Sequence, residues 1–475
     1  MSGRRRTWFY LAASVWLSGC AVGPDYRKPD LPVPTAWSAP MPHGGSTAQL
    51  VQWWDRFDDP VLTQLLTMAE ADSPTLAQAW ANIEKARATL TTNRAAGLPS
   101  VTASGSAQRE RQQQGTGATT GISTALSGTL DASWEIDLFG KVARNTEAAQ
   151  ARIDARSADW HDARVSLAAE VADDYVQYRA CRLLAQTYAD EARSQQDTAR
   201  ATAVSVKAGL TSLADGALAE ASAASVSATA TEQQTQCDVL VKTLVALTGT
   251  EETALSPLLA QGPADLPQPD RFAVESVPAA LLAQRPDLVS MERELAATSA
   301  EIGAAEADRY PSLSFSGSLS RASSLGTVMT TWLAGPALSL PVFDAGKRAA
   351  AVDSAQAAYD SQLATYKQGV RTAVKEVEQS LVRLDGAGRR TRDAETAAAG
   401  YRQYFEAAER HWRAGGISLL DREEARRNAL SADITVITVR RDQIEYWIAL
   451  YKALGGGWQP ENVATPSAKS LGESS

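Results

Sequence analysis

The chain has 475 residues and a formal net charge of −9, from 55 acidic and 46 basic side chains. This acidic balance argues against a nucleic-acid partner, because surfaces that bind nucleic acids are basic. The chain is rich in alanine and has only three histidines and five methionines, a composition that predicts long, closely packed helices rather than one thick globular core.

The N-terminus has the organisation of a signal peptide. Arg4–Arg6 form a basic region, and the apolar run Trp8–Leu17 is too short to cross a bilayer as a helix. The run ends in Leu-Ser-Gly-Cys, which predicts cleavage before Cys20 and attachment of lipid to its thiol. Ordinary signal cleavage with an incidental cysteine is the alternative. Ala21 stands where inner-membrane lipoproteins typically carry aspartate, so we expect sorting to the outer membrane.

The remainder of the chain is an internal duplication. At an offset of 206 residues, Gly140-Lys141 matches Gly346-Lys347. Upstream the offset becomes 212, where PSVTASGS at 99–106 matches PSLSFSGS at 311–318. Such self-similarity predicts two copies of one structural unit. The expected domains are a signal peptide (1–19), a lipidated extended segment (20–59), the first repeat (60–255), a proline-rich linker (256–272), the second repeat (273–458) and a flexible tail (459–475).

Each repeat is expected to contain the same elements in the same order. Ser73 and Pro74 form an N-cap and first turn, so a helix should begin there. The predicted elements of the first repeat are helices 60–71, 74–96, 141–208 and 213–248 and strands 99–111 and 122–138. Those of the second are helices 278–284, 286–309, 347–414 and 418–454 and strands 311–321 and 328–343.

The long helices are expected to form coiled-coil hairpins. At 1.5 Å per residue, a helix over 141–208 would be about 100 Å long. Its larger apolar side chains, such as Val171, Tyr175 and Tyr178, form only a narrow stripe. Such a helix must pack against neighbours along its length.

Three of the four predicted strands alternate apolar and polar residues, while 328–343 is less regular and contains Pro336 and Pro341. In 122–138, Leu126 and Leu130 alternate with Ser127, Thr129 and similar residues. Period-two patterns of this length occur in soluble half-buried strands and in transmembrane β-barrels. The serine- and threonine-rich polar face and the lipidation signal favour the membrane. Four strands cannot close a barrel, so several chains must combine in a cyclic oligomer. Three chains would supply twelve strands, although these arguments do not fix the number at three.

Two cysteines are expected to pair. Cys181 lies 28 residues before Gly209 and Cys237 lies 28 residues after it. An antiparallel hairpin turning at that glycine would bring them level, and the periplasm is oxidising. The alternative is two unpaired small core residues. The second repeat has Ala387 and Gln443 at the matching positions, so the pair is not part of the duplication.

A short turn occurs once in each repeat. KAGLTSLAD at 207–215 corresponds to RAGGISLLD at 413–421. In both, a serine precedes an aspartate by three residues (Ser212–Asp215 and Ser418–Asp421), which is the spacing of a helix capping box. In a cyclic oligomer the same acids would also form rings of negative charge, which select cations. The two interpretations are compatible.

Six ordered motifs carry a family resemblance over essentially the whole mature chain. They are CAVGPDYRKP (20–29), WWDRFDDPVL (53–62), SWEIDLFGK (133–141), QRPDL (284–288), LPVFDAGKR (340–348) and YKALGGGW (451–458). In these the chain resembles NodT-type outer-membrane lipoproteins, the TolC-like exit ducts of tripartite efflux pumps. The resemblance implies an α+β membrane protein: a homotrimer with a twelve-stranded transmembrane β-barrel, four strands from each chain, and a long α-helical barrel in the periplasm. The implied partners are a periplasmic adaptor, an inner-membrane proton-driven transporter and outer-membrane lipid.

The resemblance also assigns roles to the two turns. Asp421, Glu424 and Asp215 are expected at the periplasmic gate. The expected adaptor-docking residues of the tips are Gly209, Leu210, Ser212, Leu213, Gly415, Gly416, Ser418 and Leu419. Where relatives lock the closed state with an arginine and a tyrosine, this chain has Ile417 and Trp412. That lock is therefore in question, whereas the acidic ring is kept.

No enzyme site, metal site or cofactor is expected. His43, His161 and His411 lack the spacing of metal ligands. The expected function is passive conduction of drugs or other small toxic molecules out of the cell. The alternatives are a duct for protein secretion or a periplasm-spanning structural protein. The sequence does not identify the substrate, because the transporter and adaptor select it.

Overall fold

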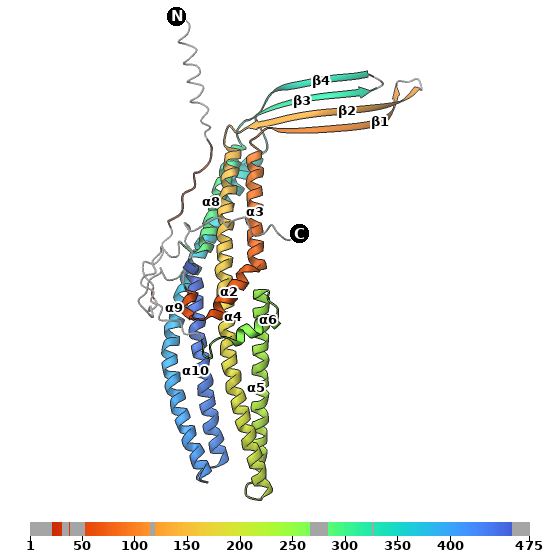
Figure 1. Cartoon of the computed structure of the whole chain (residues 1–475). Coiled ribbons are helices and arrows are strands. Elements are labelled where there is room, and N and C mark those ends of the chain that lie inside the picture. The colour runs from red at the N-terminus through yellow and green to blue at the C-terminus, as the bar shows by residue number, and fades with distance from the viewer. Residues whose placement is uncertain are drawn as a thin grey trace. The chain divides into compact units, whose positions relative to one another are not determined.

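A computed structural model describes residues 21–30, 38, 53–114, 119–266, 284–324 and 327–457. Cys20, the tail and most of the helix expected over 278–284 lie outside these ranges. In chain order the elements are η2 (Trp54–Phe57), α2 (Pro60–Ala71), α3 (Pro74–Ala95), β1 (Ser100–Gln114), β2 (Thr119–Ile136), α4 (Lys141–Lys207), α5 (Leu213–Thr248), α6 (Glu252–Ala260), α8 (Pro286–Ala307), β3 (Ser312–Ser324), β4 (Thr327–Ser339), α9 (Lys347–Arg413), α10 (Leu419–Ala453) and η3 (Gly455–Gly457) (Figure 1). None of the helices in these ranges has both the length and the apolar character that a membrane crossing requires.

The α6 helix is an element that the sequence does not predict. It begins before the expected linker and continues through Pro257, which lacks the N–H that a helix interior uses. Its Leu255 and Leu259 are almost completely buried and belong to the main apolar cluster. Tertiary burial of these two leucines therefore offsets the cost of the internal proline.

The chain folds into two compact units, and each unit combines parts of both repeats. The first is built mainly from Trp80–Ala158 and Val289–Gln368, and the second mainly from Asp159–Leu288 and Gly369–Ser475. The copies of the duplication are therefore not separate globular domains.

The first unit contains one antiparallel sheet in the order β1-β2-β3-β4. The β2–β3 pair joins the two repeats. Its register places Trp134 opposite Phe315 on one face, with ring centroids 6.3 Å apart, and Ser133 opposite Ser316 on the other. In β2 and β3 the sheet therefore has the apolar and polar faces that the alternation predicts, whereas β4 also carries Met329 and Leu333 on the polar face. Pro336 lies in β4, which is an edge strand of the sheet formed within one chain.

An N-terminal strap, residues 21–26, is fixed to the helices of the first unit. The buried Arg144 of α4 donates to the Val22 carbonyl at 3.2 Å and to the Asp25 carboxylate at 2.9 Å. Gly23 lies so close to Gly303 of α8 that a Cβ atom on Gly23 would be 2.2 Å from the Gly303 Cα. The strap is thus held by charge-assisted hydrogen bonds and by close backbone packing.

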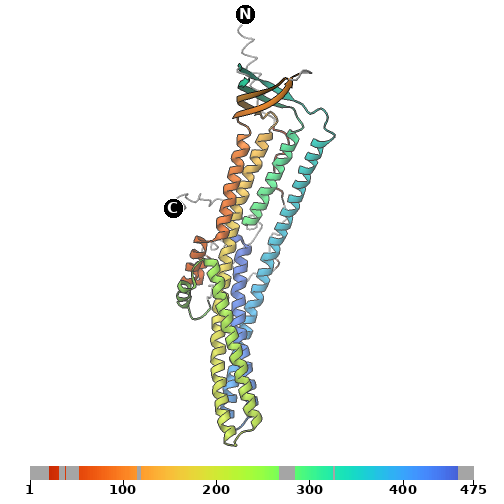
Figure 2. The ribbon, with the colours of Figure 1, turned by 90° about the vertical axis from the view of Figure 1, so that its right-hand side faces the viewer.

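The second unit contains two antiparallel helical hairpins and the main apolar core. In Figures 1 and 2, α5 lies along the C-terminal half of α4, and in Figure 1 α10 lies along α9. The largest fully buried side chains of this core are Trp53, Leu62, Leu65, Val171, Tyr175, Val176, Leu244, Leu255, Leu381, Leu384 and Leu450. Asp59 caps α2 by accepting from the Val61 amide at 3.0 Å, and it also accepts a 2.7 Å hydrogen bond from the Tyr175 hydroxyl. This core therefore fixes the part of α4 from which the first hairpin extends.

A disulfide joins the two helices of the first hairpin. Cys181 of α4 and Cys237 of α5 are bonded, with their Cα atoms 5.5 Å apart. In the second hairpin Ala387 and Gln443 stand at these positions, and a 3.3 Å hydrogen bond from Thr391 to Gln443 links the helices there. The first hairpin is thus covalently stapled and the second is not.

Candidate functional site

The two hairpin turns have the same backbone construction. Gly209 and Gly415 adopt φ angles of +73° and +76°, in the left-handed region that glycine tolerates best. The amide that follows each glycine bonds back to the helix, from Leu210 to the Ser205 carbonyl at 2.9 Å and from Gly416 to the His411 carbonyl at 2.8 Å. Both turns thus end a long helix with a glycine-dependent C-cap.

The serine and aspartate of each turn cap the helix that follows. Ser212 and Ser418 each accept a 3.1 Å hydrogen bond from the amide of the aspartate three residues later. Only the second turn completes the reciprocal capping box, because the Ser418 amide donates to the Asp421 carboxylate at 3.1 Å. Asp421 therefore contributes to the fold of its own turn, whatever else its charge does.

The tips expose a mixed set of apolar and acidic side chains. Leu210 and Leu213 are 81% and 83% exposed. In the second tip Leu419, expected at the docking surface, is buried within the chain, and its neighbour Leu420 is 52% exposed. Leu419 lies on the buried stripe of α10, so the leucine that this tip offers to a partner is Leu420.

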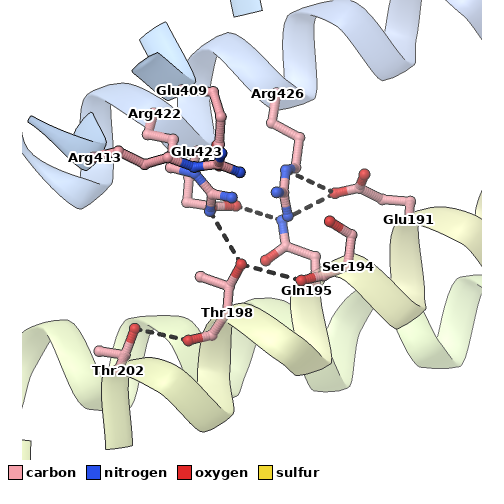
Figure 3. A network of polar contacts seen from close by, with 10 residues as sticks. All are labelled: Glu191, Ser194, Gln195, Thr198, Thr202, Glu409, Arg413, Arg422, Glu423 and Arg426. Atoms are coloured by element: carbon pink, nitrogen blue, oxygen red, sulfur yellow. Dashed lines mark hydrogen bonds and ion pairs between the residues drawn. The ribbon is translucent and has the colours of Figure 1, made fainter. Parts of the chain in front are cut away.

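A buried polar network next to the tips joins α10 of the second hairpin to α4 of the first (Figure 3). Arg422 donates to the Thr198 hydroxyl at 3.1 Å, to the Glu423 carboxylate at 2.6 Å and to the Glu409 carboxylate at 2.5 Å. Glu423 also accepts from Gln195 of α4. The network thus holds the two hairpins of one chain together through side chains.

A second arginine extends this network along the helices. Arg426 lies one turn after Arg422 and forms an ion pair of 3.7 Å with Glu191 of α4. Each arginine also faces an aromatic ring of α9: Arg422 lies 4.5 Å from the Trp412 ring centroid, and Arg426 lies 5.4 Å from that of Phe405. These cation–π contacts restrain the arginines on the side opposite α4.

The charges of this network are deeply buried. The side chains of Arg422, Glu423 and Arg426 are only 3–5% exposed. Burial by itself would raise the pKa of Glu409, but its bonds to Arg422 and Arg413 lower that pKa overall. Removing one partner from such a group leaves an uncompensated buried charge, at a cost of about 3–5 kcal/mol. The packing of the two hairpins therefore depends strongly on each charged member.

No sequence motif predicts this network. The acid expected at the gate, Glu424, is exposed, whereas the adjacent Glu423 is buried and belongs to the network. A signal is present in α10, where Leu419, Ala425 and Ala429 define a buried helical stripe that also includes Arg422 and Arg426. Charges on an otherwise apolar stripe require partners on a neighbouring helix.

Within the described ranges, no group of three or more potential ligands could hold a metal ion.

Comparison with known proteins agrees with this architecture. Residues 65–250 and 277–456 match the outer membrane efflux protein family. The chain is 32% identical over 470 residues to a probable efflux pump outer membrane protein, TtgC of Pseudomonas putida, covering 93% of each chain. It is 30% identical over 457 residues to nodulation protein T of Rhizobium leguminosarum bv. trifolii, covering 94% of this chain and 96% of that protein. The solved outer-membrane channel OprN superposes with a TM-score of 0.80 at 30% identity, over 93% of this chain and all of that one.

The fold and these similarities define an outer-membrane efflux channel component. The chain belongs to the outer membrane efflux protein family.

Proposed function

We propose that three copies of this chain form the outer-membrane exit duct of a tripartite efflux pump. The four-stranded sheet carries the proposal. It exposes an apolar face, with Leu126 53% and Trp332 79% exposed, and the outer edges of β1 and β4 are unpaired within the described part of the chain. Pairing of β1 in one copy with β4 in the next would satisfy both edges and close a twelve-stranded barrel, as a membrane requires.

In this assembly the exposed leucines of the tips would contact a periplasmic adaptor. Leu210, Leu213 and Leu420 would supply apolar anchors, because exposed apolar groups at one end of a polar hairpin indicate a protein interface. The adaptor would connect the duct to a proton-driven transporter of the inner membrane. Lipid on Cys20 would anchor the N-terminus in the outer membrane.

The gate would lie at the same tips. Three copies of Asp421 and Glu424, both exposed, would surround a common axis and favour cations at the constriction. Asp215 of the first tip is half-buried and would contribute less. The Arg422 network would hold the second hairpin against the first in the closed state. It would act in place of the arginine–tyrosine lock of relatives, because Ile417 and Trp412 stand at those positions here.

Three measurements test the duct function. The mature protein should run as a trimer in native mass spectrometry and form discrete conducting channels in planar bilayers. Deletion of its gene should increase sensitivity to at least one toxic compound, and restoring the gene should reverse the effect. A monomer without conductance, or a deletion with no change in sensitivity while the operon is induced, would contradict the proposal.

A further inference from the structure

The charged residues of the sheet are divided by sign between its two faces. Strand pairing places Arg109 opposite Thr124, Arg111 opposite Ile122 and Arg321 opposite Gly128. These β2 residues are all even-numbered and share a face with Leu126, Leu130 and Trp134, so the three arginines lie on the apolar face.

The acidic residues lie on the other face. Glu110 is opposite Ser123, and this odd-numbered face of β2 also carries Asp131 and Glu135. In the four strands as described, every arginine is therefore on the apolar face and every acid is on the polar face. In the proposed barrel the acids would line the pore, and the arginines would point toward lipid.

The arginines also occupy one end of the apolar face. Trp134 and Phe315 mark the end of the sheet near the helices, and the arginines lie toward the hairpin loops. With ~3.4 Å per residue and a strand tilt of ~40°, Arg321 is about 16 Å above Trp134, and Arg109 and Arg111 are about 26 and 31 Å above it. The apolar band of such barrels is ~25 Å tall. Arg109 and Arg111 thus lie at the level of the outer headgroups, and Arg321 can extend its long side chain toward that level.

A depression lies beside Arg321. Gly105 and Gly128 are opposite each other in the β1–β2 register, and a Cβ atom at Gly128 would meet nothing within 4 Å. The depression is lined on this face by Gly105, Ala107, Leu126, Gly128, Arg321, Ser323 and Val328. Two adjacent glycines leave room for an apolar chain next to a guanidinium group.

We propose that this surface binds a phosphorylated glycolipid of the outer leaflet, such as lipid A, a proposal that rests on the outer-membrane function above. The guanidinium groups of Arg109, Arg111 and Arg321 bind its phosphates, and the glycine depression receives an acyl chain. Arginine suits this role because its planar group bonds phosphate oxygens in pairs. Among the described residues of the four strands this face has arginines and no acids, so it complements an anionic lipid rather than a zwitterionic one.

The test measures lipid retention by the full-length trimer. Wild-type protein is reconstituted in phosphatidylcholine vesicles that contain either bis-phosphorylated or enzymatically dephosphorylated lipid A, extracted gently, and examined by native mass spectrometry. The triple variant R109Q/R111Q/R321Q is compared with R182Q/R193Q/R200Q, which removes three positive charges from α4. We expect wild type and the α4 control to retain phosphorylated lipid A at least tenfold more than the dephosphorylated form, and the sheet variant to lose most of this preference.

Several results would overturn the proposal. These are equal retention of both lipids by wild type, unchanged retention by the sheet variant, and displacement of lipid by 10 mM inorganic phosphate alone, which would indicate a site for free phosphate. If the triple variant does not form trimers, the single substitutions R109Q, R111Q and R321Q are measured, and no decrease in any of them counts against the proposal. Failure of wild type to conduct in phosphatidylcholine bilayers would instead contradict the duct function, so the two failures are distinguishable.

Discussion

Arg422 of α10 donates a 3.1 Å hydrogen bond to the Thr198 hydroxyl of α4, a residue 224 positions earlier in the chain. This contact joins the second hairpin to the first. Thr198 in turn donates to the Ser194 carbonyl of its own helix at 3.0 Å. The hydroxyl thus serves as donor and acceptor at once, so it orients the bond to Arg422. Substitutions of Arg422 and Thr198 therefore test directly whether this hydrogen bond holds the two hairpins together.

Replacing Arg422 by alanine is expected to favour the open duct. The substitution leaves Glu423 without its arginine and leaves Glu409 with Arg413 alone. Each ~1.4 kcal/mol of lost closed-state stabilisation raises the open-to-closed ratio about tenfold. Planar-bilayer recordings should show a higher open probability than in wild type. Arg427, an exposed arginine of the same helix, provides the control Arg427→Ala. Equal open probability in both variants would exclude Arg422 as a latch.

The smaller substitution Thr198→Val is expected to give a weaker effect of the same sign. It removes one hydrogen-bonding hydroxyl, worth about 1 kcal/mol, and leaves every charge in place. Open probability should therefore lie between those of wild type and Arg422→Ala. A Thr198→Val channel that opens as much as Arg422→Ala would show that the hydrogen bond, rather than charge pairing, holds the hairpins.

Asp421 has a capping role and a proposed gating role, and two substitutions separate them. Asp421→Asn removes the charge but keeps an oxygen that can accept from the Ser418 amide, whereas Asp421→Ala removes both. Both variants should reduce cation selectivity and raise single-channel conductance, while only the alanine variant should lose about 1 kcal/mol of stability. Selectivity and conductance that stay at the wild-type values in both variants would leave Asp421 with the capping role alone.

The disulfide is expected to stabilise the first hairpin substantially. Its cysteines are separated by 56 residues, and closing a loop of this size stabilises a fold by ~4 kcal/mol in the chain-entropy treatment. Dithiothreitol should lower the melting temperature of wild type and leave Cys181→Ala/Cys237→Ala unchanged. Alkylation of denatured, unreduced mature protein should modify neither cysteine. Two modified cysteines would mean that the bond does not form.

The stability of the second unit is expected to depend on pH through Glu445. Burial is the main cause that raises the pKa of this carboxyl to about 7; Asp173 and Asp442 raise it further, and Arg441 opposes them. A carboxyl whose pKa is raised on folding destabilises the fold when ionised, so this cost is present above pH 7 and is relieved as the pH falls toward 4.5. The melting temperature should therefore rise from pH 8 to pH 6 in wild type and rise less in Glu445→Gln. The idea fails if both proteins show the same slope.

The positions of helices and strands follow largely from local residues. Pro60, Pro74 and Pro286 begin helices, and Gly249 ends α5 with a left-handed φ of +65°. These residues act within one turn of their own position, so the sequence alone is sufficient to place them. The sequence alone also places Cys181 beside Cys237. Each is 28 residues from Gly209, and both helices of an antiparallel hairpin have the same rise per residue.

Contacts between distant segments cannot be predicted from local residues. The burial of Arg422 depends on α4, and the helix α6 forms because Leu255 and Leu259 reach the apolar core. Strand β4 ends at Ser339, four residues before the expected end, since the last residues include Pro341 and lie outside the register with β3. For Arg422 and α6 the deciding partner comes from another part of the chain, and no local pattern identifies it; the end of β4 has a local cause in Pro341.

The pairing of β2 with β3 also sets an order for biogenesis. A chain exported N-terminus first presents β1 and β2 well before β3, whose first residue is 176 positions after the end of β2. Until the second repeat has been exported, the edge of β2 that later pairs with β3 is unpaired. An unpaired strand edge promotes aggregation. Nascent copies must therefore be shielded during transit, and a chain truncated after its first repeat should be a substrate for degradation rather than a half-functional channel.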